Sequence, residues 1–237
     1  MRESSLRPSH ATKLVQEGLR RYSVSHFLVA LSVLIISYLF IDSLPYGQLI
    51  ETALITLVLL SAVAAIGGRR RTLILASALV LPALLARWYD HFDPEPQPHG
   101  FTLISGLVCL AFVCFQLLRY ILRAPRVDSQ VLCAGIATFL LIALVWSSAY
   151  SLVARWVPGS FVFTAGNGSN RVMAHFEAVY FSFATLTGGC GDIVPGSRVA
   201  QWLVMIESTT GMLYVTLLIA RLVGLYTTEK PGPKPGA

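Results

Sequence analysis

The chain has 237 residues, a net charge of +6 and a mean hydropathy of +0.67. Hydrophobic residues make up 55% of it and charged residues only 13%, whereas charged residues supply roughly 25% of a typical soluble domain. A core of this size cannot bury so much apolar surface, so the composition excludes an ordinary soluble protein. We therefore expect an all-α membrane protein.

Six apolar runs follow one another, each near or above the length of about 20 residues that crosses a bilayer. The third run is the shortest and contains Pro82, which a membrane helix tolerates as a kink. We expect six transmembrane helices, at residues 24–43, 48–66, 72–88, 101–122, 131–154 and 199–226.

The basic residues are distributed unevenly about these runs. With six spans and a cytoplasmic N-terminus, cytoplasmic segments hold all but four of the 18 Lys and Arg residues. This is the positive-inside bias of membrane proteins. It predicts a multi-pass protein of the cell membrane with both termini in the cytoplasm and lipids as partners. Topology accounts for the positive charge, so no nucleic-acid partner is expected. The four exceptions are Arg87, Arg155, Arg171 and Arg198.

The chain divides into four predicted segments. Residues 1–23 form a basic cytoplasmic arm that either lies on anionic headgroups or is a solvated tail. Residues 24–126 form a four-helix transmembrane domain without the recurring arginines of a voltage sensor. A two-helix unit at 127–226 and a short cytoplasmic tail at 227–237 complete the chain.

An unusual insertion separates the fifth and sixth apolar runs. Its stretch "AHFEAVYFSFATLT" predicts a helix of three to four turns, with Glu177 near the N-terminus, where the helix dipole favours an anion. His175 at its start either caps the helix or tunes proton block. The following "GGCGDIVPGS" is Gly-rich, and irregular backbone at membrane depth is tolerated only inside protein or beside a watery cavity. A re-entrant loop that presents carbonyls to an ion is expected; a tight glycine turn between buried helices is the alternative.

The stretch "YFSFATLTGGCGDIVPGSRVAQWLVMIESTTGMLYVTLLIARLVGLY" resembles the pore domain of tetrameric potassium channels, especially the bacterial two-helix type. The matching features are "VPGSF", the aromatic pore helix, Thr-x-Thr, Gly-Asp-x-x-Pro and Gly211, where the family's inner helix often bends. The resemblance covers about 130–226. It implies a homotetramer whose central pore conducts monovalent cations passively, potassium first. K⁺ would bind filter carbonyls, and no cofactor is implied.

The selectivity filter departs from the family's Thr-Val-Gly-Tyr-Gly-Asp. Gly188 takes the place of the stiff valine and Cys190 that of the tyrosine, and one residue is deleted upstream. Both replacements remove packing behind the filter, so strict potassium selectivity is not expected. The Cys190 thiol either supports the filter from behind, faces the ions or is filler. The alternative function is a non-selective or non-conducting homologue that acts as a membrane sensor or scaffold. The aligned filter is Thr187, Gly188, Gly189, Cys190 and Gly191, followed by Asp192.

Other polar residues of this unit have predicted roles. Glu207 either supports the pore helix from behind, with Thr185 or Ser182 as hydroxyl partner, or faces the pore and attracts cations. Asp192 either contributes to a ring of carboxylates at the outer mouth, or it caps a helix or forms a local salt bridge with Arg198. No nucleophile–base pair or metal-ligand cluster is evident, so neither an enzyme nor a soluble partner is expected. A pore-lining stripe is expected, with a leucine gate or plain helix packing at its end, from Thr209, Thr210, Leu213 and Leu217.

Overall fold

The computed structural model describes residues 10–41, 44, 47–66, 70–92, 100–124, 128–164, 173–189 and 191–228. Cys190, the first nine residues of the predicted arm and residues 229–237 of the predicted tail lie outside the described residues. The described part is helical apart from two short strands. Its elements are α1 (His10–Ile41), α2 (Gly47–Ile66), α3 (Arg70–Phe92), α4 (Gly100–Arg123), α5 (Ser129–Trp156), β1 (Phe161–Phe163), α6 (His175–Thr187), β2 (Ile193–Pro195) and α7 (Arg198–Thr228).

All six apolar runs are helices, although their bounds differ from the predicted ones. The helix α1 begins at His10, so residues 10–23 of the predicted arm are part of this helix. Pro82 lies inside α3, which runs on to Phe92. In the described part, four helices are long and apolar enough to span a membrane: Val24–Ile41, Gly100–Arg123, Ser129–Trp156 and Arg198–Gly224. The apolar parts of α2 and α3 are shorter, at Leu49–Val63 and Ile74–Tyr89. The chain is thus a helical membrane protein.

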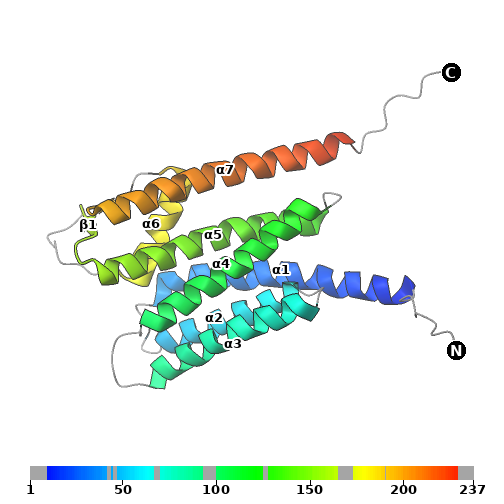
Figure 1. Ribbon diagram of the computed structural model, residues 1–237, viewed down its shortest axis with the longest axis horizontal. Coiled ribbons are helices and arrows are strands. Elements are labelled where there is room, and N and C mark those ends of the chain that lie inside the picture. The colour runs from blue at the N-terminus through cyan, green and yellow to red at the C-terminus, as the bar shows by residue number, and fades with distance from the viewer. Residues whose placement is uncertain are drawn as a thin grey trace.

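The helices pack around α5. This helix contacts α1, α4, α6 and α7, and 56% of its apolar span is buried. By contrast, α7 lies along the edge of the bundle opposite α2 and α3 (Figure 1), and only 17% of its span is buried. Because so little of α7 is buried in one copy of the chain, this helix presents a broad apolar face outward.

Among the described residues, four buried apolar clusters hold these elements, and two of them are the largest. The larger core joins α1, α2, α4 and α5 through side chains such as Phe27, Leu31, Val58 and Leu141. The smaller core lies at the end of α5, where that helix meets α6, α7 and the strands. Burial of large side chains there stabilises the connection by roughly 1.5–3 kcal/mol each. The buried members of this second core are Tyr150, Phe161, Met173, Ala178, Phe181, Ile193 and Ala200.

Candidate functional site

The two ends of the segment between α5 and α7 lie side by side, because they are paired as strands. Strand β1 leaves α5 and pairs antiparallel with β2, which leads into α7, with Phe161 opposite Pro195 and Phe163 opposite Ile193. Just past the ribbon, the Thr164 backbone N–H and hydroxyl both donate to the Asp192 carbonyl, at 2.7 and 2.9 Å. The chain that carries α6 is therefore closed at its base by hydrogen bonds. This two-stranded ribbon was not predicted from the sequence.

Helix α6 is the short helix expected in this insertion. Its 13 residues extend about 20 Å, less than the roughly 30 Å of a bilayer's hydrocarbon core. Glu177 lies in the first turn, where the helix dipole stabilises a carboxylate. One face is buried against α5 and α7, and its buried residues are Ala178, Val179, Phe181, Ser182, Thr185 and Leu186.

Gly188 ends α6. Its φ of 75° and ψ of 19° are left-handed, a conformation that glycine adopts without the steric cost of a Cβ. The Gly188 and Gly189 N–H groups donate to the Thr185 and Ala184 carbonyls at 3.2 and 2.7 Å, which satisfies the last turn as in a Schellman cap.

The predicted filter is consequently divided. Thr187 is the last residue of α6 and its hydroxyl donates to the Phe183 carbonyl at 2.8 Å. Between this cap and β2, the described residues Gly189, Gly191 and Asp192 are not helical. A Cβ added at Gly191 would lie 3.3 Å from the Tyr180 ring, so Gly191 packs closely on α6. The helix ends at Thr187, as the sequence predicted, and Gly188 supplies its left-handed cap.

A buried carboxylate holds α5, α6 and α7 together. Glu207 in α7 is fully buried. Ser182 of α6 donates to Oε1 at 2.5 Å and also lies 2.8 Å from the Ala143 carbonyl of α5, while the Tyr150 hydroxyl donates to Oε2. Of the two hydroxyls expected as partners of Glu207, Ser182 is confirmed. Each carboxylate oxygen has a donor, which a buried charge requires.

Tyr150 links this network to the ribbon, and nothing in the sequence marked it as a site residue. Its ring makes edge-to-face contacts with Phe181 of α6 and Phe161 of β1, with centroids 4.9 and 5.5 Å apart. Such aromatic pairs add about 0.5–1.5 kcal/mol beyond their buried area. A single side chain from α5 thus contacts α6, α7 and β1.

Gly211 is a point of close contact between α6 and α7. A Cβ at this position would lie 2.6 Å from the Leu186 carbonyl oxygen, and the Ser208 hydroxyl lies 3.4 Å from the Thr185 carbonyl one turn earlier. The helix α7 runs without interruption through Gly211. The glycine therefore lets two backbones approach, whereas the bend expected at this residue stays a prediction.

The other predicted residues of α7 face outward in the single chain. Thr209 and Thr210 donate to carbonyls of their own helix, those of Met205 and Ile206. Leu213 and Leu217 are 56% and 63% exposed. Asp192 is also exposed, and its carbonyl is bonded to Thr164. The structure thus brings Ser182 to Glu207, while the Thr185 carbonyl lies beside Ser208, the next residue of α7.

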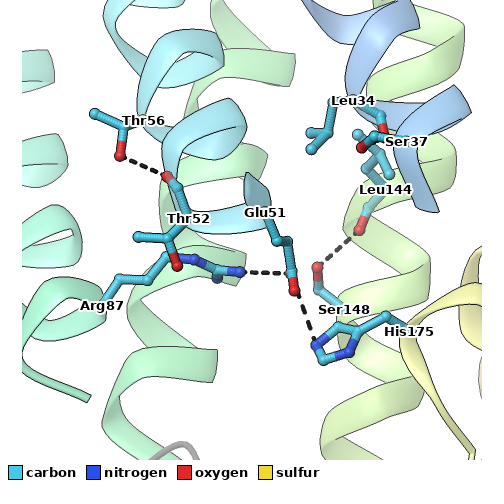
Figure 2. A network of polar contacts seen from close by, with 9 residues as sticks. All are labelled: Leu34, Ser37, Glu51, Thr52, Thr56, Arg87, Leu144, Ser148 and His175. Atoms are coloured by element: carbon cyan, nitrogen blue, oxygen red, sulfur yellow. Dashed lines mark hydrogen bonds and ion pairs between the residues drawn. The ribbon is translucent and has the colours of Figure 1, made fainter. Parts of the chain in front are cut away.

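A second polar cluster, missed in the sequence, lies at the start of α6. Figure 2 shows Glu51 of α2 between Arg87 of α3 and His175 of α6, with Glu51 Oε1 2.5 Å from Arg87 Nη2 and 3.8 Å from His175 Nε2. The His175 ring also stacks on Tyr38 of α1, with centroids 6.4 Å apart. His175 therefore contacts both α1 and α2 and connects the start of α6 to the four-helix part.

The site is built from two long helices, α5 and α7, with the short helix α6 packed between them. Residues 138–228 match the model of a family described as ion channel, and the matched segment includes α6, the glycine segment and Glu207. No curated protein and no solved structure matches the chain. The matched residues are less than half of the chain and include most of α5 and all of α7.

The Glu207 network yields a stability prediction. Tyr150→Phe removes the donor to Oε2 and leaves a buried carboxylate oxygen without a partner, so the free energy of unfolding in detergent should fall by about 2 kcal/mol. Tyr180→Phe, at a residue that is 43% exposed on α6, is the control and should change it little. Combining Tyr150→Phe with Glu207→Leu should cost less than the sum of the single changes; strictly additive costs would contradict the network.

The contact at Gly211 yields a second prediction. Gly211→Ala should lower the midpoint temperature of unfolding, because the new Cβ displaces α7 from the Leu186 carbonyl, although alanine favours a helix by about 1 kcal/mol. Gly224→Ala, where a Cβ meets nothing within 4 Å, should leave the midpoint unchanged or raise it. Equal shifts for the two variants would show that α6 and α7 are not in backbone contact.

Proposed function

We propose that the protein is a cation channel of the potassium-channel type, in which four copies of the chain surround a central pore. The observation that carries this proposal is the closed insertion: α6 is too short to span, and the β1–β2 ribbon joins its entry to its exit. Such a segment enters the membrane and returns to the same side as a re-entrant loop. Its non-helical backbone at that depth must line a watery cavity or lie in protein.

The outward apolar face of α7 supports assembly. Trp202, Met205 and Met212 are 65%, 62% and 75% exposed in the single chain, and one glycine segment alone cannot make a ring of carbonyls. In a homotetramer, four copies of α7 surround the axis, with Thr209, Thr210, Leu213 and Leu217 as the lining candidates. Asp192 then contributes to four carboxylates at the mouth, which concentrate cations.

In this assembly backbone carbonyls from Thr187 to Gly191 replace the hydration shell of a monovalent cation, with potassium the first candidate by resemblance. The negative ends of four α6 dipoles are directed toward the ion cavity. The six apolar helices are the proposed spans, and the distribution of basic residues supports cytoplasmic termini in the cell membrane.

The left-handed cap favours one alternative. Because Gly188 terminates α6, fewer extended residues are available for a stack of carbonyl rings than in the family's filter. A shorter stack offers fewer sites at which ions are distinguished, which favours a non-selective pore. A non-conducting homologue that serves as a membrane sensor or scaffold is the remaining alternative.

Ion flux from vesicles distinguishes these functions. The purified protein, verified as a tetramer, is reconstituted and its K⁺ and Na⁺ efflux are compared with those of empty vesicles. We expect passive flux of both ions with K⁺ faster. Equal rates would identify the non-selective alternative, and no flux of either ion would contradict a channel.

The cap supplies a fourth prediction. Gly188→Val restores the residue found in the family's filter, yet it places a branched side chain in the left-handed region at a cost of about 1–2 kcal/mol. We therefore expect Gly188→Val to lower both stability and flux. Gly188→Asn is the control, since asparagine tolerates this conformation. Higher potassium selectivity in Gly188→Val at unchanged stability would show that the cap opens in the conducting protein.

A further inference from the structure

A cavity of about 90 Å³ lies between the four-helix part and the start of α6. Residues of six helices, α1 to α6, line it, with polar residues at the end of the bundle where α2 and α4 begin and apolar residues deeper inside. In α2 the sequence of lining residues passes from Glu51 to Leu59, and in α4 from Thr102 to Leu110. In α5 it passes from Ser151 inward to Leu144. The polarity of the wall therefore changes along the depth of the cavity.

Two buried polar groups at the polar end have no hydrogen-bond partner among the described residues. They are Arg87 Nε and Thr102 Oγ1, and Thr102 is only 6% exposed. A buried donor left unpaired costs about 1–3 kcal/mol, so such a group normally has water or a ligand beside it. Both groups belong to residues that line the cavity.

Hydrogen-bond acceptors face these donors across the cavity. The hydroxyls of Ser147 and Ser148 both donate to the Leu144 carbonyl, at 2.9 and 2.8 Å, and that of Ser151 donates to the Ser147 carbonyl at 3.0 Å. Their hydrogens are thus used within α5 while their oxygens retain lone pairs. The polar end therefore offers both donors and acceptors, as a hydroxyl group requires.

The polar end also carries paired charges. Arg87 is bound to Glu51 at 2.5 Å (Figure 2), so the two formal charges cancel. A charged headgroup would add an uncompensated charge beside this pair, which a partly buried site disfavours. An uncharged head is therefore the better fit.

The dimensions select a chain-like molecule. The lining residues of α2 and α4 each extend over eight residue steps, about 12 Å along a helix, so the cavity is elongated and suits an alkyl chain. Gly106 lines its middle, and a Cβ there would meet nothing within 4 Å.

We propose that this cavity binds a single-chain, uncharged amphiphile whose hydroxyl head lies at Arg87 and Thr102 and whose alkyl chain runs between Leu59, Leu110 and Leu144. Because His175 of α6 lines the same polar end, an occupant touches the first residue of the predicted pore helix. The site is separate from the glycine segment, and its binding is measurable whether or not the protein conducts.

The test is photolabelling of the full chain in vesicles with a diazirine-bearing 1-octanol, followed by mapping of the adducts by mass spectrometry. We expect adducts at the deep apolar lining that excess 1-octanol abolishes. Octane and octanoate should compete several-fold less well, because octane lacks the hydroxyl and octanoate adds a charge. Adducts confined to the outward faces of the helices, or not displaced by 1-octanol, would mean that water alone fills the cavity and would overturn the proposal.

Matched variants test where the alkyl chain and the hydroxyl head of the amphiphile lie. Gly106→Leu should reduce the displaceable labelling about tenfold by filling the cavity, whereas Gly224→Leu, at another open helical glycine, should not. If Gly106→Leu fails to fold, Gly106→Ala takes its place with a smaller reduction. Thr102→Val, which keeps the shape and removes the hydroxyl, should weaken competition by 1-octanol about fivefold. Unchanged labelling in Gly106→Leu or Gly106→Ala, or unchanged competition in Thr102→Val, would overturn the assignment.

Discussion

The burial of the Glu207 carboxylate is the constraint on which the domain of α5, α6 and α7 depends. A carboxylate removed from solvent requires a donor for each oxygen, and here the donors come from two other helices, Tyr150 of α5 and Ser182 of α6. The three helices cannot shift relative to one another without leaving an oxygen unpaired. Apolar packing would hold them at a similar distance, but it is not directional, and the hydrogen bonds fix the rotation of α6 about its own axis.

The same domain is fixed at its two ends by different means. At the base, the β1–β2 ribbon and the bonds from Thr164 to the Asp192 carbonyl join the entry and exit of the insertion. At the far end, the left-handed Gly188 closes α6, and Gly211 allows the α7 backbone to approach Leu186. Tyr150 connects the two ends, since its hydroxyl reaches Glu207 while its ring contacts Phe161 of the ribbon.

The sequence predicted those features that depend on local pattern. Hydropathy gave the six apolar helices, and the Ser182–Glu207 contact was foreseen because an intramembrane carboxylate needs a nearby hydroxyl. The ribbon was missed, because strands of three residues such as Phe161–Phe163 carry too little alternation to be recognised. The Glu51–Arg87 and Glu51–His175 contacts join residues far apart in the chain, and no local signal encodes such pairs. The left-handed cap at Gly188 was not foreseen, because a glycine that follows a helix is compatible both with a cap and with an extended segment.

The insertion is anchored on both sides of the glycine segment, by the α6 cap before it and by the ribbon after it. Everything before Gly189 is held by the α6 cap, and everything after Asp192 is held by the ribbon. A change of one residue in length between these anchors alters how many carbonyls are offered and leaves the surrounding helices in place. The frame made by Tyr150, Ser182, Glu207 and the ribbon is therefore tolerant of changes in the length of the glycine segment.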